Sequence, residues 1–341
     1  MAIRTNVRYY YLEAYTPRGH ISLVPDLLEE CLCTYQLMAS AGLDKSTFIK
    51  LLGIQLSDRC YDVDYIREAH DSDVLAGLFL PGSHVLIMDV NGFGREGAGD
   101  ACGGLRVMID LGECVHKARW EECRPEIESI LVRLECLGNQ RDEQLALEYP
   151  RAQEADDPMD LMAHHEFPRF FRGFQGMEEV SCEDLSTILT MIKTNKVSFC
   201  FLHALQSDGW TNYAPRYLRH LDRICVDEDG SDGIWHTILD EIKSLGQRIE
   251  IILHPIYPFR VIGIIFPWKK LALWRGNPVK LKELGLKERH GPELEGILEE
   301  MRCLRQRMRG LTHECVSAQR LDEMRNDLIG HILGQVKRVE G

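Results

Sequence analysis

The chain has 341 residues, 45% hydrophobic and 27% charged, and its 40 basic and 53 acidic residues give a net charge of −13. This length fits one large domain or two ordinary ones, and the composition excludes wholesale disorder and a fibrous rod. The negative charge argues against broad nucleic-acid binding, which needs a positive surface. No apolar window is long enough for a transmembrane span, and the N-terminus lacks the apolar run of a signal peptide, so a soluble, cytoplasmic protein is expected.

The 12 cysteines are scattered along the chain, and no two of them form a C-x-x-C pair. Closed zinc sites usually show paired ligands at short spacing, so we expect reduced thiols and no bound metal. Walker A, G-x-S-x-G and S-x-x-K signatures are also missing. No cofactor is therefore predicted, and the balance favours a protein that is not an enzyme.

The first half of the chain mixes strand and helix patterns. Residues 7–15 and 20–24 predict two strands around a turn at residues 17–19. The next predicted elements are helices over 27–41, from 44 or 46 to 52 and, weakly, over 63–78, then strands over 84–90 and 105–115. A helix is predicted over 120–137, because Ile127, Ile130, Leu131, Leu134 and Leu137 recur at helical spacing.

An acidic stretch with two prolines, residues 140–168, predicts a linker or a surface excursion. The elements predicted after it are a helix over 181–192, a buried strand over 196–205, helices over 214–225 and 234–245, and strands over 248–254, 259–266 and 271–275. The short connections between the last three strands predict antiparallel neighbours.

From Pro292 onward the pattern is helical. Six apolar residues step by 3, 4, 3, 4 and 3 and form an a/d seam, namely Leu294, Ile297, Met301, Leu304, Met308 and Leu311. A second apolar stripe holds Leu321, Met324, Leu328, Ile332 and Val336. A break between Gly310 and Ala318 separates the stripes, which predicts two amphipathic helices.

The order of these elements predicts an α+β fold with two mixed lobes, largely antiparallel sheets and a C-terminal amphipathic helix pair. The expected segments are an N-terminal lobe over 1–139, the acidic linker over 140–168, a second lobe over 169–290 and a helical segment over 291–341. No internal repeat is visible in the sequence.

A glycine-rich segment follows the predicted strand at 84–90. Gly92, Gly94 and Gly97 match G-x-G-x-x-G, and Gly99 follows two residues later; such glycines let backbone N–H groups approach a phosphate. A dinucleotide site also needs a helix directly after the glycines, and here the loop leads into a strand. The segment is therefore either a long hairpin loop or a phosphate-binding loop.

Several polar groups were considered as metal or acid–base sites. The run from Asp227 to Gly233 departs from a calcium loop at positions 6 and 12, which predicts a solvated turn. His164, His165 and Glu166 fit surface positions in the acidic linker, and His254 in its apolar strand fits a hydrogen-bonded core histidine. A further set of polar residues is interpreted as the solvent-exposed face of a helix and not as a divalent-metal site. This set consists of Asp62, Asp64, His70, Asp71 and Asp73.

The C-terminal region is basic on an acidic chain, with a net charge of about +5 over residues 267–311. One helical stripe carries arginines beside the apolar seam, and the residues predicted to meet a partner are Met301, Arg302, Leu304, Arg305, Met308 and Arg309. The alternative is a helix packed on its own domain, so that one part of the chain docks on another. A third interpretation is nucleic-acid binding by the 267–311 block.

The leading hypothesis is a cytosolic, non-catalytic interaction or regulatory protein that binds another protein through these C-terminal helices and does not contact a membrane. The alternative is a nucleotide- or phosphate-binding enzyme or sensor that uses the loop from Gly92 to Gly99. Identity of the partner or substrate and the oligomeric state do not follow from the sequence.

Overall fold

A computed structural model of the chain describes residues 5–17, 19–40, 43, 45–90, 104–150, 197–226, 248–257 and 261–340. The contacts divide the chain into two compact units. Unit 1 comprises Met1–Tyr9, Leu27–Arg141 and Glu293–Gly341, and unit 2 comprises Tyr10–Asp26 and Asp142–Pro292. Both units are therefore discontinuous in sequence, and the C-terminal helices fold with the N-terminal part of the chain.

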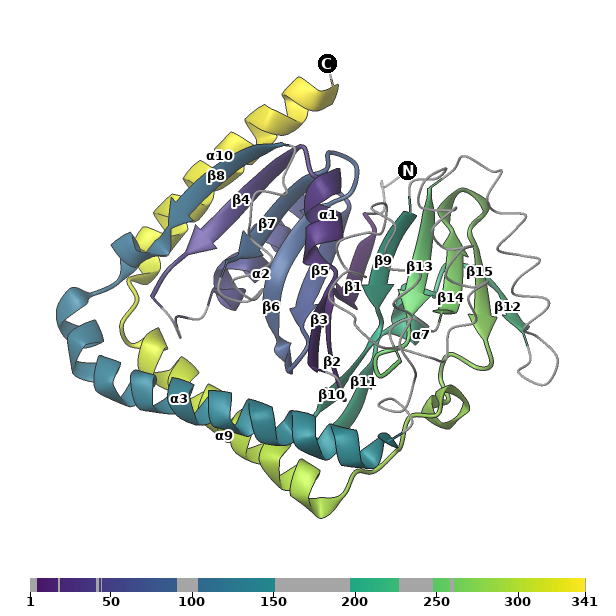
Figure 1. The fold of residues 1–341 in the computed structure, drawn as a ribbon. Helices are drawn as coiled ribbons and strands as arrows, with labels where there is room; N and C mark the ends of the chain where they lie inside the picture. The colour runs from purple at the N-terminus through teal and green to yellow at the C-terminus, as the bar shows by residue number, and fades with distance from the viewer. Residues whose placement is uncertain are drawn as a thin grey trace, which may run out of the picture. The chain divides into compact units, whose positions relative to one another are not determined.

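In its described residues, unit 1 combines a mixed sheet with four helices of eight or more residues (Figure 1). Its strands are β1 (Val7–Tyr11), β4 (Cys33–Met38), β5 (Val63–Glu68), β6 (Asp71–Leu80), β7 (Val85–Asp89) and β8 (Leu105–Asp110). Its helices are α2 (Ser46–Ser57), the short η1 (Leu111–Cys114), α3 (Lys117–Glu148), α9 (Pro292–His313) and α10 (Ala318–Glu340), while β1, α1 (Val24–Glu30), α3 and α9 also have residues in unit 2. The sheet order is β1-β5-β6-β7-β4-β8.

One face of this sheet forms the core of unit 1 with α2 and α10. Tyr35 and Ile87 from the strands, Leu52 from α2 and Ile332 from α10 are all fully buried there. Burying a side chain of this size contributes roughly 1.5–3 kcal/mol, so the amphipathic stripe predicted for the second C-terminal helix supplies part of the driving force for folding. Val107 and Ile109 of β8 are half-buried against the same cluster, beside which α10 runs (Figure 1).

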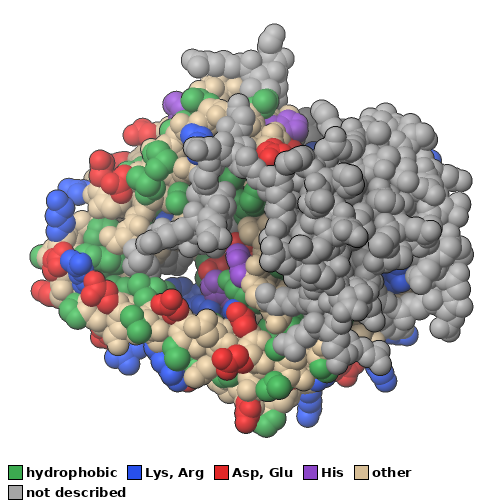
Figure 2. All heavy atoms as spheres, viewed as in Figure 1, with side chains coloured by type: hydrophobic (Ala, Val, Ile, Leu, Met, Phe, Trp, Pro, Cys, Tyr) green, Lys and Arg blue, Asp and Glu red, His purple; other side chains and the backbone are tan. Residues whose placement is uncertain are grey.

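The predicted a/d seam of α9 packs as an antiparallel pair with α3. Ion pairs join the two helices at intervals of one heptad: Arg119 with Glu314 at 3.3 Å, Glu126 with Arg307, and Arg133 with Glu300 at 2.7 Å. Exposed pairs of this kind add little stability, but their alternating signs fix the register of the two helices. In Figure 2, side chains of both charges are interspersed along these helices.

Unit 2 is built from two small hairpins and a second mixed sheet. The hairpins are β2 (Glu13–Thr16) with β3 (Gly19–Ser22), and β10 (His203–Gln206) with β11 (Gly209–Asn212). The sheet order is β9-β13-β14-β15-β12, formed by β9 (Val197–Phe201), β13 (Ile249–Leu253), β14 (Val261–Phe266), β15 (Leu271–Arg275) and β12 (Asp222–Val226). The remaining elements are α7 (Ala214–Tyr217), η3 (Pro267–Lys269) and η4 (Leu281–Leu284).

The two halves of the chain repeat one topology, which the sequence had not shown. The order β1-β5-β6-β7-β4 corresponds strand by strand to β9-β13-β14-β15-β12. The hairpins β2–β3 and β10–β11 have the same register 190 residues apart, and both turn at a glycine of positive φ, Gly19 at 109° and Gly209 at 112°. Farther along, Gly77 faces Met88 in the first half and Gly263 faces Trp274 in the second. Gly263 lies 186 residues after Gly77, and Trp274 lies 186 residues after Met88.

The α+β class and the C-terminal helix pair are confirmed, and the sheets are mixed because parallel pairs flank the antiparallel ones. The strands predicted over 248–254, 259–266 and 271–275 form as antiparallel neighbours β13, β14 and β15. The helix predicted over 120–137 lies inside the longer α3. Among the described residues, no helix is long and apolar enough to cross a membrane.

Three predicted helices are wrong. Residues 27–41 form only the short α1 and then β4, residues 63–78 form β5 and most of β6, and residues 214–225 form α7 and β12. In each case a strand gains partners that lie far away in sequence, such as β7 and β8 on the two sides of β4. The spacing of residues along the sequence does not show such long-range strand pairing, and this tertiary pairing overrides helical propensity.

Candidate functional site

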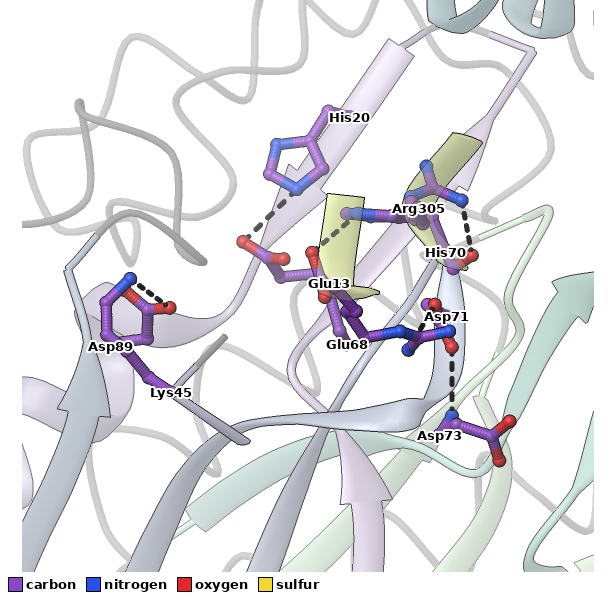
Figure 3. A network of polar contacts seen from close by, with 10 residues as sticks. Glu13, His20, Lys45, Glu68, His70, Asp71, Asp73, Asp89 and Arg305 are labelled. Atoms are coloured by element: carbon purple, nitrogen blue, oxygen red, sulfur yellow. Dashed lines mark hydrogen bonds and ion pairs between the residues drawn. The ribbon is translucent and has the colours of Figure 1, made fainter. Parts of the chain in front are cut away.

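The arginines of α9 meet the turn between β5 and β6 (Figure 3). Arg305 donates from Nη1 to the carbonyl oxygen of His70 at 3.0 Å, and Arg309 donates from Nη1 to Oδ2 of Asp71 at 3.0 Å. The two arginines lie one helical turn apart and are both half-buried. Asp71 also accepts the backbone N–H of Asp73 at 3.1 Å, which shapes the turn that receives the arginines. We call this contact the α9–turn site.

A histidine–carboxylate pair lies in the same turn. Nε2 of His70 is 2.5 Å from Oε1 of Glu68. Burial raises the pKa of Glu68, but the attraction of His70, Arg305 and Lys45 outweighs it and the net pKa is lowered. Burial lowers the pKa of His70, and the neighbouring charge of Arg305 lowers it further. Both lowered pKa values are consistent with a neutral His70 imidazole that donates its Nε2–H to the ionised Glu68 carboxylate.

A buried lysine forms an ion pair directly before α2. Nζ of Lys45 is 2.9 Å from Oδ2 of Asp89, at the end of β7 (Figure 3). The Lys45 side chain is only 2% exposed, so its charge is screened little by water and acts on Glu68 as well. Positive groups from α2 and α9 and negative groups from β5, β6 and β7 thus balance one another inside unit 1.

The five polar residues considered as a metal site do not form one cluster. Asp62 accepts the N–H of Asn6 at 2.7 Å and Asp64 accepts a hydrogen bond from Arg8 Nε at 2.7 Å, while His70, Asp71 and Asp73 belong to the α9–turn site. These segments form strands and a turn, so the predicted helix face does not exist. The described part of the chain contains no group of histidine, cysteine and carboxylate side chains that could hold a metal.

Five of the six residues predicted to meet a partner lie in the protein's own packing. Met301 is buried, Leu304 and Met308 are half-buried in the seam, and Arg305 and Arg309 reach the β5–β6 turn. Arg302 is exposed and pairs with Glu299 one turn earlier in α9. Whether these residues also contact another protein stays a prediction, and so does nucleic-acid binding by the 267–311 block.

The glycine loop cannot be placed, since Gly92, Gly94, Gly97 and Gly99 lie outside the described residues, as do His164, His165, Glu166 and the run from Asp227 to Gly233. His254 is confirmed as a hydrogen-bonded core histidine. Its Nε2 is 2.7 Å from the Leu284 carbonyl, and its Nδ1 accepts the N–H groups of Ile256 at 3.1 Å and Tyr257 at 3.0 Å. This requires the Nε2–H tautomer and leaves neither ring nitrogen for catalysis.

Glu148 and His290 form a site in unit 2 that the sequence analysis missed. Glu148 accepts the N–H of Gly291 at 2.6 Å and lies 2.9 Å from Nδ1 of His290 and 3.4 Å from Nζ of Lys287. Burial raises the pKa of Glu148, but these hydrogen bonds and charges lower it below its usual value. Because Gly291 directly precedes α9, the carboxylate also stabilises the N-terminus of that helix. No local sequence pattern signals a pair 142 residues apart.

The edge of the unit 1 sheet is a further surface that the sequence did not single out. Strand β8 pairs in parallel with β4 from Leu105 to Asp110, and among the described residues no strand pairs with its other edge. Leu105 donates its N–H to Leu32 at 2.9 Å, so by strand alternation the backbone groups of Arg106, Met108 and Asp110 point away from β4. The side chains of Leu105 and Met108 are 50% and 52% exposed.

No family model matches the chain, and neither a curated protein nor a solved structure matches it.

Proposed function

We propose that the protein is a non-catalytic, cytoplasmic protein that binds a protein partner at the open edge of β8, which α10 flanks. The observation that carries this proposal is the edge itself. It presents a regular six-residue strand that has β4 as its one strand neighbour among the described residues, and its Leu105 and Met108 side chains are half-exposed. Proteins usually protect such edges with prolines, bulges or inward-pointing charges, because an open edge pairs readily with another strand.

The C-terminal helices keep a role in this proposal, although not the one expected for the α9 arginines. Arg305 and Arg309 hold α9 against the β5–β6 turn, which supports the alternative that one part of the chain docks on another. Helix α10 instead lies beside β8 on the core of unit 1, where Leu321, Met324 and Leu333 remain half-buried. A segment that adds to β8 would contact this helix as well.

A proline substitution in β8 tests the proposal, with the full-length protein as bait in an extract of its native host. Met108→Pro removes an N–H that points outward and leaves the hydrogen bonds to β4 intact, because prolines are tolerated at such edge positions. Met108→Ala is the matched control that keeps the N–H. We expect a host protein bound by wild type and Met108→Ala and lost with Met108→Pro. Its binding should slow amide exchange at Met108 and Asp110.

Equal capture by wild type and Met108→Pro, or slowed exchange only at other elements, would contradict the proposal. Failure to recover any partner whose binding depends on position 108 would contradict it too. Circular dichroism of each variant establishes that both substitutions leave the fold intact.

A further inference from the structure

Two cysteine thiols meet inside unit 1, where α3 begins and α9 ends. Cys123 lies in the second turn of α3, and Cys315 follows two residues after the last residue of α9. Both are free thiols, and their side chains are hydrogen-bonded to each other. Because 192 residues separate the two cysteines in the chain, this contact exists only in the folded protein.

Backbone and ion-pair contacts hold the two thiols together. His116, directly before α3, donates its N–H to the carbonyl oxygen of Cys315 at 2.8 Å. An antiparallel bridge joins the same two connecting segments. On α3, Arg119 lies one turn before Cys123 on the same face of the helix and contacts Glu314, the neighbour of Cys315, at 3.3 Å. The approach of the thiols is therefore fixed from both sides.

The two thiols differ in their access to solvent. Cys123 is half-buried, whereas Cys315 is completely buried and donates its thiol hydrogen to the carbonyl oxygen of Leu311 at 3.3 Å. Burial raises the pKa of Cys315 to about 11, and the hydrogen bond and charge of Cys123 add to this rise. Cys315 is therefore a protected thiol, and a small oxidant from solvent reaches Cys123 first.

An accessible cysteine beside a second, protected one is the arrangement of redox-sensing sites, in which the second thiol resolves the product formed on the first. In a reducing compartment such a pair stays reduced until an oxidant arrives, and disulfides there are usually transient. From this contact we infer that Cys123 and Cys315 form a redox-modification site, which hydrogen peroxide converts into an intramolecular disulfide. The inference does not depend on what binds at β8.

The reaction has two steps. Hydrogen peroxide transfers one oxygen atom to the sulfur of Cys123, which gives a sulfenic acid and releases one water. The sulfur of Cys315 then displaces the hydroxyl group of that sulfenic acid, and the thiol proton of Cys315 leaves with it as a second water. Both sulfur atoms are oxidised and both peroxide oxygen atoms are reduced. The new bond joins α3 to the connection between α9 and α10 and closes a long loop, which stabilises unit 1 against unfolding.

Peptide mass spectrometry of the full-length protein tests the inference. The reduced protein is treated with hydrogen peroxide, alkylated and digested without reductant. We expect a linked peptide pair that contains Cys123 and Cys315, about 2 Da lighter than the two reduced peptides together and separated again by dithiothreitol. Cys123→Ser should abolish this link. Cys303→Ser, which removes an exposed thiol of α9, is the matched control and should form the link as wild type does.

Two further measurements address the order of the steps and the need for the folded contact. Cys315→Ser should leave the sulfenic acid of Cys123 unresolved, so that dimedone traps it. In wild type, the link should form about tenfold or more faster in the folded protein than in urea, because folding brings together two thiols that a long loop otherwise separates. Oxidised wild type should unfold at a higher urea concentration than reduced wild type, and Cys123→Ser should lack this shift.

Folded wild-type protein whose exposed Cys303 is oxidised while Cys123 and Cys315 stay unlinked would overturn the inference. So would a link that forms equally fast in urea, or a disulfide that joins Cys123 mainly to another cysteine. These three outcomes are read from the wild-type protein, so they do not depend on how well any variant folds.

Discussion

His203 should make unit 2 sensitive to mild acid. The side chain lies at the start of β10, is fully buried, and has no hydrogen-bond partner for either ring nitrogen among the described residues. Burial alone lowers its pKa from 6.5 to about 3. The imidazole is therefore neutral in the folded protein, whereas in the unfolded chain it takes up a proton below about pH 6.5.

The sign and size of the effect follow from proton linkage. The unfolded state binds more protons as the pH falls below 6.5, so the free energy of unfolding decreases with falling pH until about pH 3, where the folded histidine also titrates. Integration gives a loss of about 2 kcal/mol between pH 7 and pH 5. The result changes little if the folded pKa is one unit higher, because both values lie well below pH 5.

The assay is urea unfolding at several pH values between 7 and 5, followed by the fluorescence of tryptophans in unit 2, which include the fully buried Trp274. His203→Leu removes the titrating group at similar volume, so wild type should lose about 2 kcal/mol more than this variant over the same range. His220→Leu, at an exposed position, is the control and should behave as wild type. Parallel losses in wild type and His203→Leu would refute the reasoning.

Three further substitutions test other contacts. Gly263→Ala places a Cβ 2.5 Å from the buried Trp274 ring and should cost about 1–3 kcal/mol in urea unfolding. Glu148→Gln should cost about 1–2 kcal/mol near pH 7, and the difference should vanish as the pH falls below 4.5 through the lowered folded pKa of Glu148. Asp71→Asn keeps an acceptor for the turn but removes the charge that Arg309 meets, and should lower stability by about 1–2 kcal/mol.

Gly263→Ala has a matched control, and each of the other two substitutions has an outcome that would contradict it. Gly296→Ala adds a Cβ with nothing within 4 Å in the interior of α9 and should stabilise by about 0.5–1 kcal/mol. If Gly263→Ala is equally harmless, the contact with Trp274 is not tight. A Glu148→Gln difference that persists unchanged at acid pH would show that the ionised carboxylate is not what stabilises the start of α9. An unchanged unfolding curve for Asp71→Asn would mean that Arg309 contributes nothing at the α9–turn site.

The sequence predicted the elements whose pattern is local. The seam from Leu294 to Leu311 and the stripe from Leu321 to Val336 are continuous periodic patterns, and both helices form. The prediction for residues 27–41 fails because β4 is a strand with a parallel neighbour on each side. Such strands lack polar–apolar alternation, which removes the signal that identifies a strand.

The α9–turn site could not be predicted, because Arg305 and His70 are 235 residues apart in the chain. The sequence did mark both sides, as an arginine stripe and as a polar cluster. It even allowed that one part of the chain docks on another. What it could not provide was the pairing, because that depends on which face of α9 packs on α3 and which face remains for the turn.

The internal repeat escaped detection because few positions keep their residue type. In the hairpins, Gly19 and Gly209 agree where a positive φ requires glycine, and Pro25 and Pro215 agree at the start of the following helix. Most other positions only need to be apolar and of suitable size, which leaves no alignable pattern. Glu13 and His203 show how far equivalent buried positions diverge, since one pairs with His20 at 3.2 Å and the other is enclosed without a partner among the described residues.

The repeat also separates what the fold needs from what has been added to it. Both halves build the same five-stranded order, which in the second half ends at β12. Strand β8 and helices α3, α9 and α10 have no counterpart in the described part of the second half. Within the described residues, these elements are additions to the repeated order of strands. Helices α3 and α9 pair with each other and α9 contacts the β5–β6 turn, whereas β8 extends the sheet of unit 1 by one strand beyond the repeated order.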